Sequence, residues 1–201
     1  MNLSVNKMII GLTGGIATGK TTVTNYLENK YKIPVIDADI LARKAVHKNT
    51  PIYHQIVKRY GQNILAKNDE LNRQQLGDII FKDEKEKKWL ENQIHPYVRK
   101  EIEKMINQID NPIIVLSIPL LFEAKMTDLV TTIWVVSCDF ETQLSRLQIR
   151  NNLDRDSAIA RIKSQMPLAE KIKKSDLILN NNNSIENLYQ EIDREIKKKT
   201  I

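Results

Sequence analysis

The sequence predicts an α/β fold, a three-layer arrangement around a five-stranded parallel sheet, with a helical insertion and a lid. Three observations support this prediction. Five short apolar runs alternate with helical stretches, a glycine-rich segment joins the first run to a helix, and residues 39–111 contain no convincing strand. Strands that alternate with helices favour a parallel sheet covered on both faces, with ligands at the carboxyl ends of the strands.

The strands are expected at the apolar runs, which are residues 8–13, 33–36, 113–118, 132–137 and 176–180. Polar breaks divide the insertion into candidate helices at residues 39–47, 51–60, 72–81 and 84–108. We therefore expect a nucleotide-binding core of residues 1–38, 112–140 and 169–201, a helical acceptor subdomain of residues 39–111, and a lid of residues 141–168.

The glycine-rich segment carries the pattern G-x-x-x-x-G-K-T between a strand and a helix, which is the context that a P-loop requires. In this geometry backbone N–H groups and the helix N-terminus face phosphates, the lysine reaches the outer phosphates, and the threonine hydroxyl can hold Mg²⁺. The pattern predicts a P-loop NTPase-type fold that binds ATP with Mg²⁺, with Thr21 as the metal ligand. The expected ATP-binding residues are Gly14, Gly15, Ile16, Ala17, Thr18, Gly19, Lys20, Thr21 and Thr22.

Two carboxylates and an arginine follow the second apolar run. In a parallel sheet that strand end lies on the same side as the P-loop, so Asp37 or Asp39 could accept a proton from an attacking hydroxyl. Arg43, one helical turn further on, could meet a substrate anion. Either aspartate could instead cap the helix that it precedes, and for Asp37 both interpretations stay open.

Composition limits the function classes. The net charge of +6 comes from basic residues mixed with acidic ones, with the excess at Lys171, Lys173, Lys174 and residues 197–199. This pattern indicates solvated helix faces and an anionic small substrate, with no nucleic-acid partner. No apolar stretch reaches membrane-spanning length, and the first seven residues contain no apolar signal core. A single cysteine, Cys138, is expected to be a buried inert thiol, and the chain is expected to be cytoplasmic.

The chain resembles the dephospho-CoA kinase family over nearly its full length. The motifs that carry the resemblance occur in the family's order. They are the Gly-Gly-x-x-x-Gly-Lys-Thr loop, Asp37-Ala-Asp-x-x-Ala-Arg43, Leu71-Asn-Arg73, His95-Pro-x-Val-Arg99, Pro119-Leu-Leu-Phe-Glu123, Gln143-x-x-Arg-Leu-x-x-Arg150 and Arg161-Ile-x-Ser-Gln165. The resemblance implies transfer of the γ-phosphoryl group of ATP to the ribose 3′-hydroxyl of dephospho-CoA, which is the last step of coenzyme A synthesis.

The resemblance also assigns roles to residues. It makes Asp39 the expected base, with Lys20 and Arg146 as the other catalytic residues, and it implies that Arg150 supports Arg146 and that Asn180 lies near the adenine. The residues it assigns to the acceptor are Asp39, Arg43, His95, Arg99 and Leu120.

Alternative interpretations remain for several of these residues. A histidine before a proline, as at His95, is more often a loop or helix-break residue. Arg146 and Arg150 are four residues apart and share a helix face, which could simply be solvated. Leu120 could be ordinary packing at a strand end.

Three positions depart from the family's pattern. Ala17 stands where the family usually has a glycine, Ser117 where relatives often have an aspartate, and Asn151 follows Arg150 where an aspartate is common. It therefore stays open whether a carboxylate from the third strand assists Mg²⁺. A kinase for another small acceptor is the alternative function. A GTPase switch is disfavoured because no D-x-x-G element occurs. A monomer or weak homo-oligomer is expected.

Overall fold

The computed structural model describes residues 7–199. Residues 1–6, which hold most of the segment expected to lack a signal core, lie outside the described residues, as do residues 200–201. The chain divides into two compact units. Unit 1 is Met1–Asp37 with Ile109–Ile201, and unit 2 is Ala38–Gln108.

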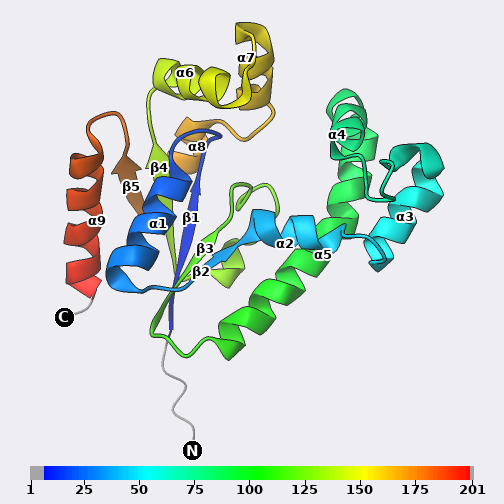
Figure 1. Cartoon of the computed structure of the whole chain (residues 1–201). Coiled ribbons are helices and arrows are strands. Elements are labelled where there is room, and N and C mark those ends of the chain that lie inside the picture. The colour runs from blue at the N-terminus through cyan, green and yellow to red at the C-terminus, as the bar shows by residue number, and fades with distance from the viewer. Residues whose placement is uncertain (1–6, 200–201) are drawn as a thin grey trace, which may run out of the picture. The chain divides into compact units, whose positions relative to one another are not determined.

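Unit 1 contains a sheet of five parallel strands in the order β2-β3-β1-β4-β5, which confirms the predicted fold class (Figure 1). The strands are β1 (Met8–Gly14), β2 (Val35–Asp37), β3 (Ile113–Ser117), β4 (Thr132–Ser137) and β5 (Leu177–Asn180). The second strand begins two residues later than expected. Pro34 has no N–H to donate to a sheet ladder, although its carbonyl accepts from the Val115 N–H at 3.0 Å.

One face of the sheet is covered by α1 (Lys20–Tyr31) and α9 (Ile185–Lys199), which pack against each other. Alternate strand residues such as Ile10, Leu12 and Trp134 are fully buried in one cluster with Leu27 of α1 and Ile192 of α9. The period of two in the strands therefore directs a continuous apolar layer toward these two helices.

The rest of unit 1 lies in the chain just before β4 and after it. It comprises η2 (Thr127–Leu129), α6 (Phe140–Asn151), α7 (Arg155–Lys163) and α8 (Leu168–Lys173), with α8 against β4. Helices α6 and α7 form their own small core of Leu144, Leu147 and Ala158. The side chains of Ile16 and Ala17 pack against this core, so the α6–α7 pair and the glycine-rich loop share one apolar cluster.

Unit 2 consists of helices, as expected from the lack of strand-like runs. They are α2 (Ala38–Ala45), α3 (Pro51–Tyr60), η1 (Gln62–Ile64), α4 (Arg73–Lys82) and α5 (Glu84–Gln108). Helix α5 runs unbroken through Pro96, so the helix break considered at His95 is wrong. Proline removes only one backbone donor, and burial of Leu90, Val98 and Ile102 on either side holds the helix together.

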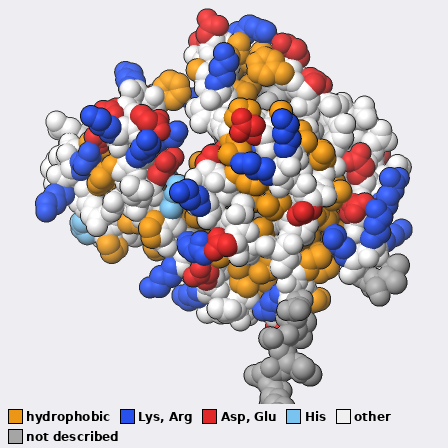
Figure 2. All heavy atoms as spheres, turned by 180° about the vertical axis from the view of Figure 1, so that it is seen from behind, with side chains coloured by type: hydrophobic (Ala, Val, Ile, Leu, Met, Phe, Trp, Pro, Cys, Tyr) orange, Lys and Arg blue, Asp and Glu red, His pale blue; other side chains and the backbone are white. Residues whose placement is uncertain are grey.

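The surface of the described residues agrees with a solvated mixture of charges. Acidic and basic side chains are interspersed on the face seen in Figure 2. One expectation is wrong, because Lys171 is completely buried and is not part of an exposed basic patch. No helix within residues 7–199 combines the length and the apolar character needed to cross a bilayer.

Candidate active site

The P-loop lies between the end of β1 and the start of α1. Glycine is required at both ends of its motif, since Gly14 has φ 154° and Gly19 has φ 103°. A Cβ on Gly14 would lie 2.5 Å from the Val136 carbonyl oxygen, and one on Gly19 would collide with the Asn181 amide. Ala17 also adopts the left-handed region, at φ 60°, a backbone conformation that favours glycine.

The N-terminus of α1 is left without a side-chain cap. Its N-cap residue is Gly19, which has no side chain to accept a hydrogen bond from the first turn. Uncapped N–H groups at the positive end of a helix form an anion site. The Lys20 Nζ donates to the carbonyl oxygens of Gly15 at 3.2 Å and Gly14 at 3.5 Å, and Thr21 is exposed. The loop therefore brings together the groups that phosphate binding needs.

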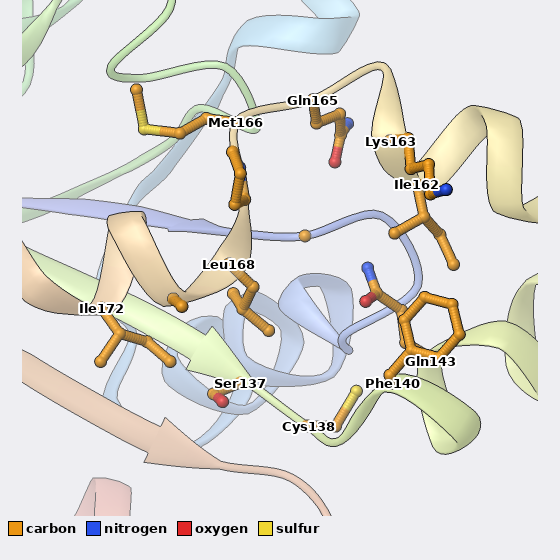
Figure 3. Close-up of a pocket in the computed structure, with 13 residues that line it drawn as sticks. Ser137, Cys138, Phe140, Gln143, Ile162, Lys163, Gln165, Met166, Leu168 and Ile172 are labelled. Atoms are coloured by element: carbon orange, nitrogen blue, oxygen red, sulfur yellow. The ribbon is translucent and has the colours of Figure 1, made fainter.

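Three side-chain amides hold the P-loop from outside. The Ile16 N–H donates to Gln165 Oε1 at 2.9 Å, while the Ile16 carbonyl accepts from Gln143 Nε2 at 2.8 Å. The Asn181 Nδ2 donates to the Thr18 carbonyl at 2.8 Å. Gln143 and Asn181 are buried, and the Asn181 bond is shielded from water, so these amides fix the loop's shape. Figure 3 shows Gln143 and Gln165 approaching the loop from either side.

The two arginines lie on α6, as their spacing predicts, but in different surroundings. Arg146 is half-buried, and its buried Nη1 has no hydrogen-bond partner within the described part of the chain. Such a buried donor is available to a water molecule or to an oxygen of a bound molecule. Arg150 is exposed, and its Nε donates to Asn151 Oδ1 at 2.9 Å. The structure thus places the two residues in different surroundings.

Cys138, after β4, is buried as expected. Burial raises the pKa of its thiol, and the nearby Arg146 opposes that shift. The neighbouring Asp139 caps α6, and hydrogen bonds from the Thr142 N–H and hydroxyl lower the pKa of its carboxyl. The thiol is therefore protonated at neutral pH and unreactive.

The asparagine run after β5 is built into the same region. The Asn180 side chain accepts from the Asn182 N–H at 3.0 Å, and the Asn182 side chain accepts from the Asp139 N–H at 2.7 Å. Asn180, the residue expected near adenine, is exposed, whereas Asn181 contacts the P-loop. This loop consequently links β5 to both the P-loop and α6.

The segment from Pro119 to Glu123 forms turns after β3. Glu123 Oε1 accepts from Lys171 Nζ at 2.9 Å and from the Met166 N–H at 3.0 Å. Lys171 also donates to the Pro119 carbonyl at 2.8 Å. Leu120 is half-buried beside these groups in the chain. The ion pair therefore fastens the chain after α7 to the end of β3.

A cavity of about 480 Å³ opens beside Gly15 (Figure 3). Its walls come from the end of β4, the start of α6 and the chain from α7 into α8. They are mostly apolar and include Phe140, Ile162, Met166 and Ile172. Such a lining suits an apolar part of a bound molecule, with amides at the edge to orient it.

The remaining acceptor candidates belong to unit 2. Asp39 lies in the first turn of α2 and is not its N-cap, and Arg43 follows one turn later; both are exposed. His95 and Arg99 are half-buried one turn apart on α5, which packs against α2. Arg99 forms an ion pair with Glu103 at 3.0 Å. Four polar candidates thus occupy two adjoining helices.

A carboxylate stands beside Ser117. Asp37 at the end of β2 is its register partner on the neighbouring strand. Among the described residues no cluster of three histidine, cysteine, aspartate or glutamate side chains could hold a metal ion. A single carboxylate beside a hydroxyl, as at Asp37 and Ser117, fits Mg²⁺. This ion commonly takes one or two protein oxygens and obtains others from phosphates and water.

Three functional side chains were missed as such by sequence reasoning. Gln143 and Gln165 appeared only as motif letters, and Asn181 was given no role. The sequence did contain a signal. An irregular loop leaves backbone N–H and C=O groups unpaired, and side-chain amides can form hydrogen bonds with them. The pairing itself spans 127, 149 and 163 residues, which no local pattern reveals.

Comparisons with known proteins agree with this geometry. A family model described as dephospho-CoA kinase matches residues 8–187. The dephospho-CoA kinase of Trichormus variabilis is 51% identical over 94% of this chain and 96% of its own length, and that of Synechocystis is 50% identical over 92% of each.

Solved structures give the same result. The Campylobacter jejuni dephospho-CoA kinase superposes with a TM-score of 0.70 and 31% identity, covering 96% of this chain and 98% of that one. The TT1252 protein of Thermus thermophilus has a TM-score of 0.82 and 30% identity with the same coverage. A shikimate kinase from Bacteroides thetaiotaomicron, 12% identical with a TM-score of 0.54, shares the fold. From its P-loop, its motifs and these matches, the chain belongs to the dephospho-CoA kinase family.

Proposed function

We propose that this protein transfers the γ-phosphoryl group of ATP to the ribose 3′-hydroxyl of dephospho-CoA, releasing coenzyme A and ADP. The observation that carries the proposal is the P-loop, whose uncapped helix N-terminus and Lys20 suit a triphosphate, in a chain that has the family's motifs from end to end. A cytoplasmic monomer or weak homo-oligomer is part of this proposal.

Phosphoryl transfer depends mainly on alignment and on neutralising charge. In our proposal Asp39 accepts the proton of the attacking hydroxyl. Lys20 exchanges its loop carbonyl partners for the outer phosphates, and Arg146 gives its buried donor to a phosphate oxygen, with Arg150 in support. Arg43, His95, Arg99 and Leu120 contact the acceptor, and residues 141–168 act as a lid that excludes water.

Thr21 would hold Mg²⁺ through its hydroxyl, with Asp37 or Asp39 acting through water. Bound there with ATP, the ion would neutralise phosphate charge. Thr21→Ala should raise the Mg²⁺ concentration needed for ATP binding. Calorimetric titration of ATP at several Mg²⁺ concentrations measures this directly, and an unchanged Mg²⁺ dependence would remove Thr21 as the ligand.

The acceptor is tested by measuring ADP release with a panel of alcohols that includes dephospho-CoA, shikimate and nucleoside monophosphates, with mass analysis of each product. Dephospho-CoA should gain one phosphoryl group at the 3′ position. Phosphorylation of another acceptor without dephospho-CoA would replace our proposal by the alternative kinase function.

The proposed base is tested by Asp39→Asn, with Asp78→Asn on the exposed part of α4 as the matched control. A general base typically contributes about 10²- to 10⁴-fold, so kcat should fall in that range while ATP binding persists. The control should keep its kcat. Full activity in Asp39→Asn would show that another group takes the proton.

A further inference from the structure

The two ends of the proposed lid meet at one P-loop residue, Ile16. Gln143, on the first turns of α6, binds the Ile16 carbonyl. Gln165, after α7, accepts from the Ile16 N–H. The backbone N–H and the carbonyl oxygen of Ile16 therefore both form hydrogen bonds with lid side chains.

The two amides differ in how firmly they are held. Gln143 is buried, with its Nε2 only 2.5 Å from where a Cβ on Gly15 would lie. It is on a helix whose N-cap, Asp139, is separated from β4 by Cys138 alone. Gln165 is half-buried in the irregular chain between α7 and α8. Gln143 is thus a fixed support, whereas Gln165 is the attachment that the lid's second end makes to the loop.

Two further contacts place Gln165. Its neighbour Met166 donates its N–H to Glu123, which is paired with the buried Lys171. On the loop side, Ile16 and Ala17 pack against Leu144, Leu147 and Ala158 of the lid. The Gln165 hydrogen bond lies between these anchors, so its position is determined from both directions.

We propose that Gln165 is a positioning residue for phosphoryl transfer, which couples the lid to the P-loop through the Ile16 N–H. The proposal rests on the lid role given above to residues 141–168. Gln165 acts through the loop and need not touch the nucleotide. Without its acceptor oxygen the chain after α7 would keep only the Met166 hydrogen bond and the apolar packing of the lid, and its arginines would be less well aligned with the phosphates.

The test uses the full chain with Gln165→Met, which keeps the length of the side chain and removes the acceptor. The matched control is Gln148→Met, since Gln148 is a half-buried glutamine of the same lid whose amide donates to the Leu153 carbonyl, within the lid itself, at 3.4 Å. We expect kcat to fall at least about fivefold in Gln165→Met, as for loss of one net hydrogen bond, with the KM for dephospho-CoA within about twofold. Gln148→Met should retain kcat.

Amide hydrogen exchange of Ile16 in ¹⁵N-labelled, nucleotide-free protein is the second readout. It should accelerate in Gln165→Met and return to its original rate in Gln165→Glu, because a carboxylate oxygen also accepts the N–H. Unchanged Ile16 exchange in Gln165→Met would overturn the attachment itself. Faster exchange with unchanged kcat, or an equal loss of kcat in the control, would overturn the coupling. The exchange result does not depend on the lid role. A failure of the Gln165 attachment can therefore be told apart from a failure of the proposed lid role.

Discussion

The complete burial of the Lys171 ammonium makes Glu123 the more costly partner to lose from this ion pair. Glu123→Ala leaves a fully buried cation with only the Pro119 carbonyl as acceptor. Loss of one partner from a buried pair costs ~3–5 kcal/mol. Since one hydrogen bond survives, we expect the lower end, ~3 kcal/mol. Lys171→Met leaves a carboxylate whose side chain is 25% exposed and still accepts the Met166 N–H. Its cost should be ~1–2 kcal/mol for two net hydrogen bonds.

Urea unfolding measures this difference. The chain has two tryptophans, and in a Trp89→Phe background the buried Trp134 of β4 reports on unit 1 alone. With equal m values, the midpoints give the change in the free energy of unfolding. The double variant should resemble Lys171→Met, because no stranded cation remains. Equal losses in the two single variants, or a larger loss in Lys171→Met, would refute the argument from the buried charge.

Three further predictions concern other parts of the chain. Ala17→Gly should stabilise the protein by ~0.5 kcal/mol in urea unfolding, as relief of left-handed strain slightly exceeds the added entropy of the unfolded chain; a loss above ~1 kcal/mol would contradict this. Asn181→Ala should cost ~1–3 kcal/mol in the same assay, because the Thr18 carbonyl loses its buried donor, and a neutral result would show that water replaces the amide. Hydrogen bonds from Arg59, and then from Tyr60, lower the pKa of Glu86 from 4.5 to about 2, so its contribution is complete above pH 4.5 and disappears as the pH falls toward 2. The difference in Tm between the unsubstituted protein and Glu86→Gln should accordingly shrink between pH 6 and pH 3, and a constant difference would show that the carboxylate's charge is not involved.

Most of the fold could be predicted from local sequence patterns. The strands could be predicted because parallel strands covered on both faces are nearly continuous apolar runs, and the P-loop because its turn requires glycine at fixed spacing. Helix α5 was also predicted with its correct bounds, but the effect of Pro96 was not. A helix interior tolerates proline when packing on both sides of it supplies the missing stability, and packing is a property of the folded unit.

The parts that could not be predicted depend on distant partners. Lys171 looks like any surface lysine in the sequence, and only the folded unit brings Glu123 and the Pro119 carbonyl to its ammonium. The same holds for Arg146, whose helix face was predicted but whose buried Nη1 was not. Burial of a charge reflects the whole surroundings of a side chain, which spacing along one helix does not contain.

A Cβ on Gly19 would collide with Asn181, which bears on how the P-loop motif changes in evolution. Gly19 is needed for the folded shape of the loop whether or not a nucleotide ever binds. A descendant that had abandoned ATP would still be selected to keep this glycine, while the exposed Thr21 could drift. In genomes that carry degenerate copies of such a chain, the Mg²⁺ role proposed for Thr21 would make the threonine the better marker of retained activity.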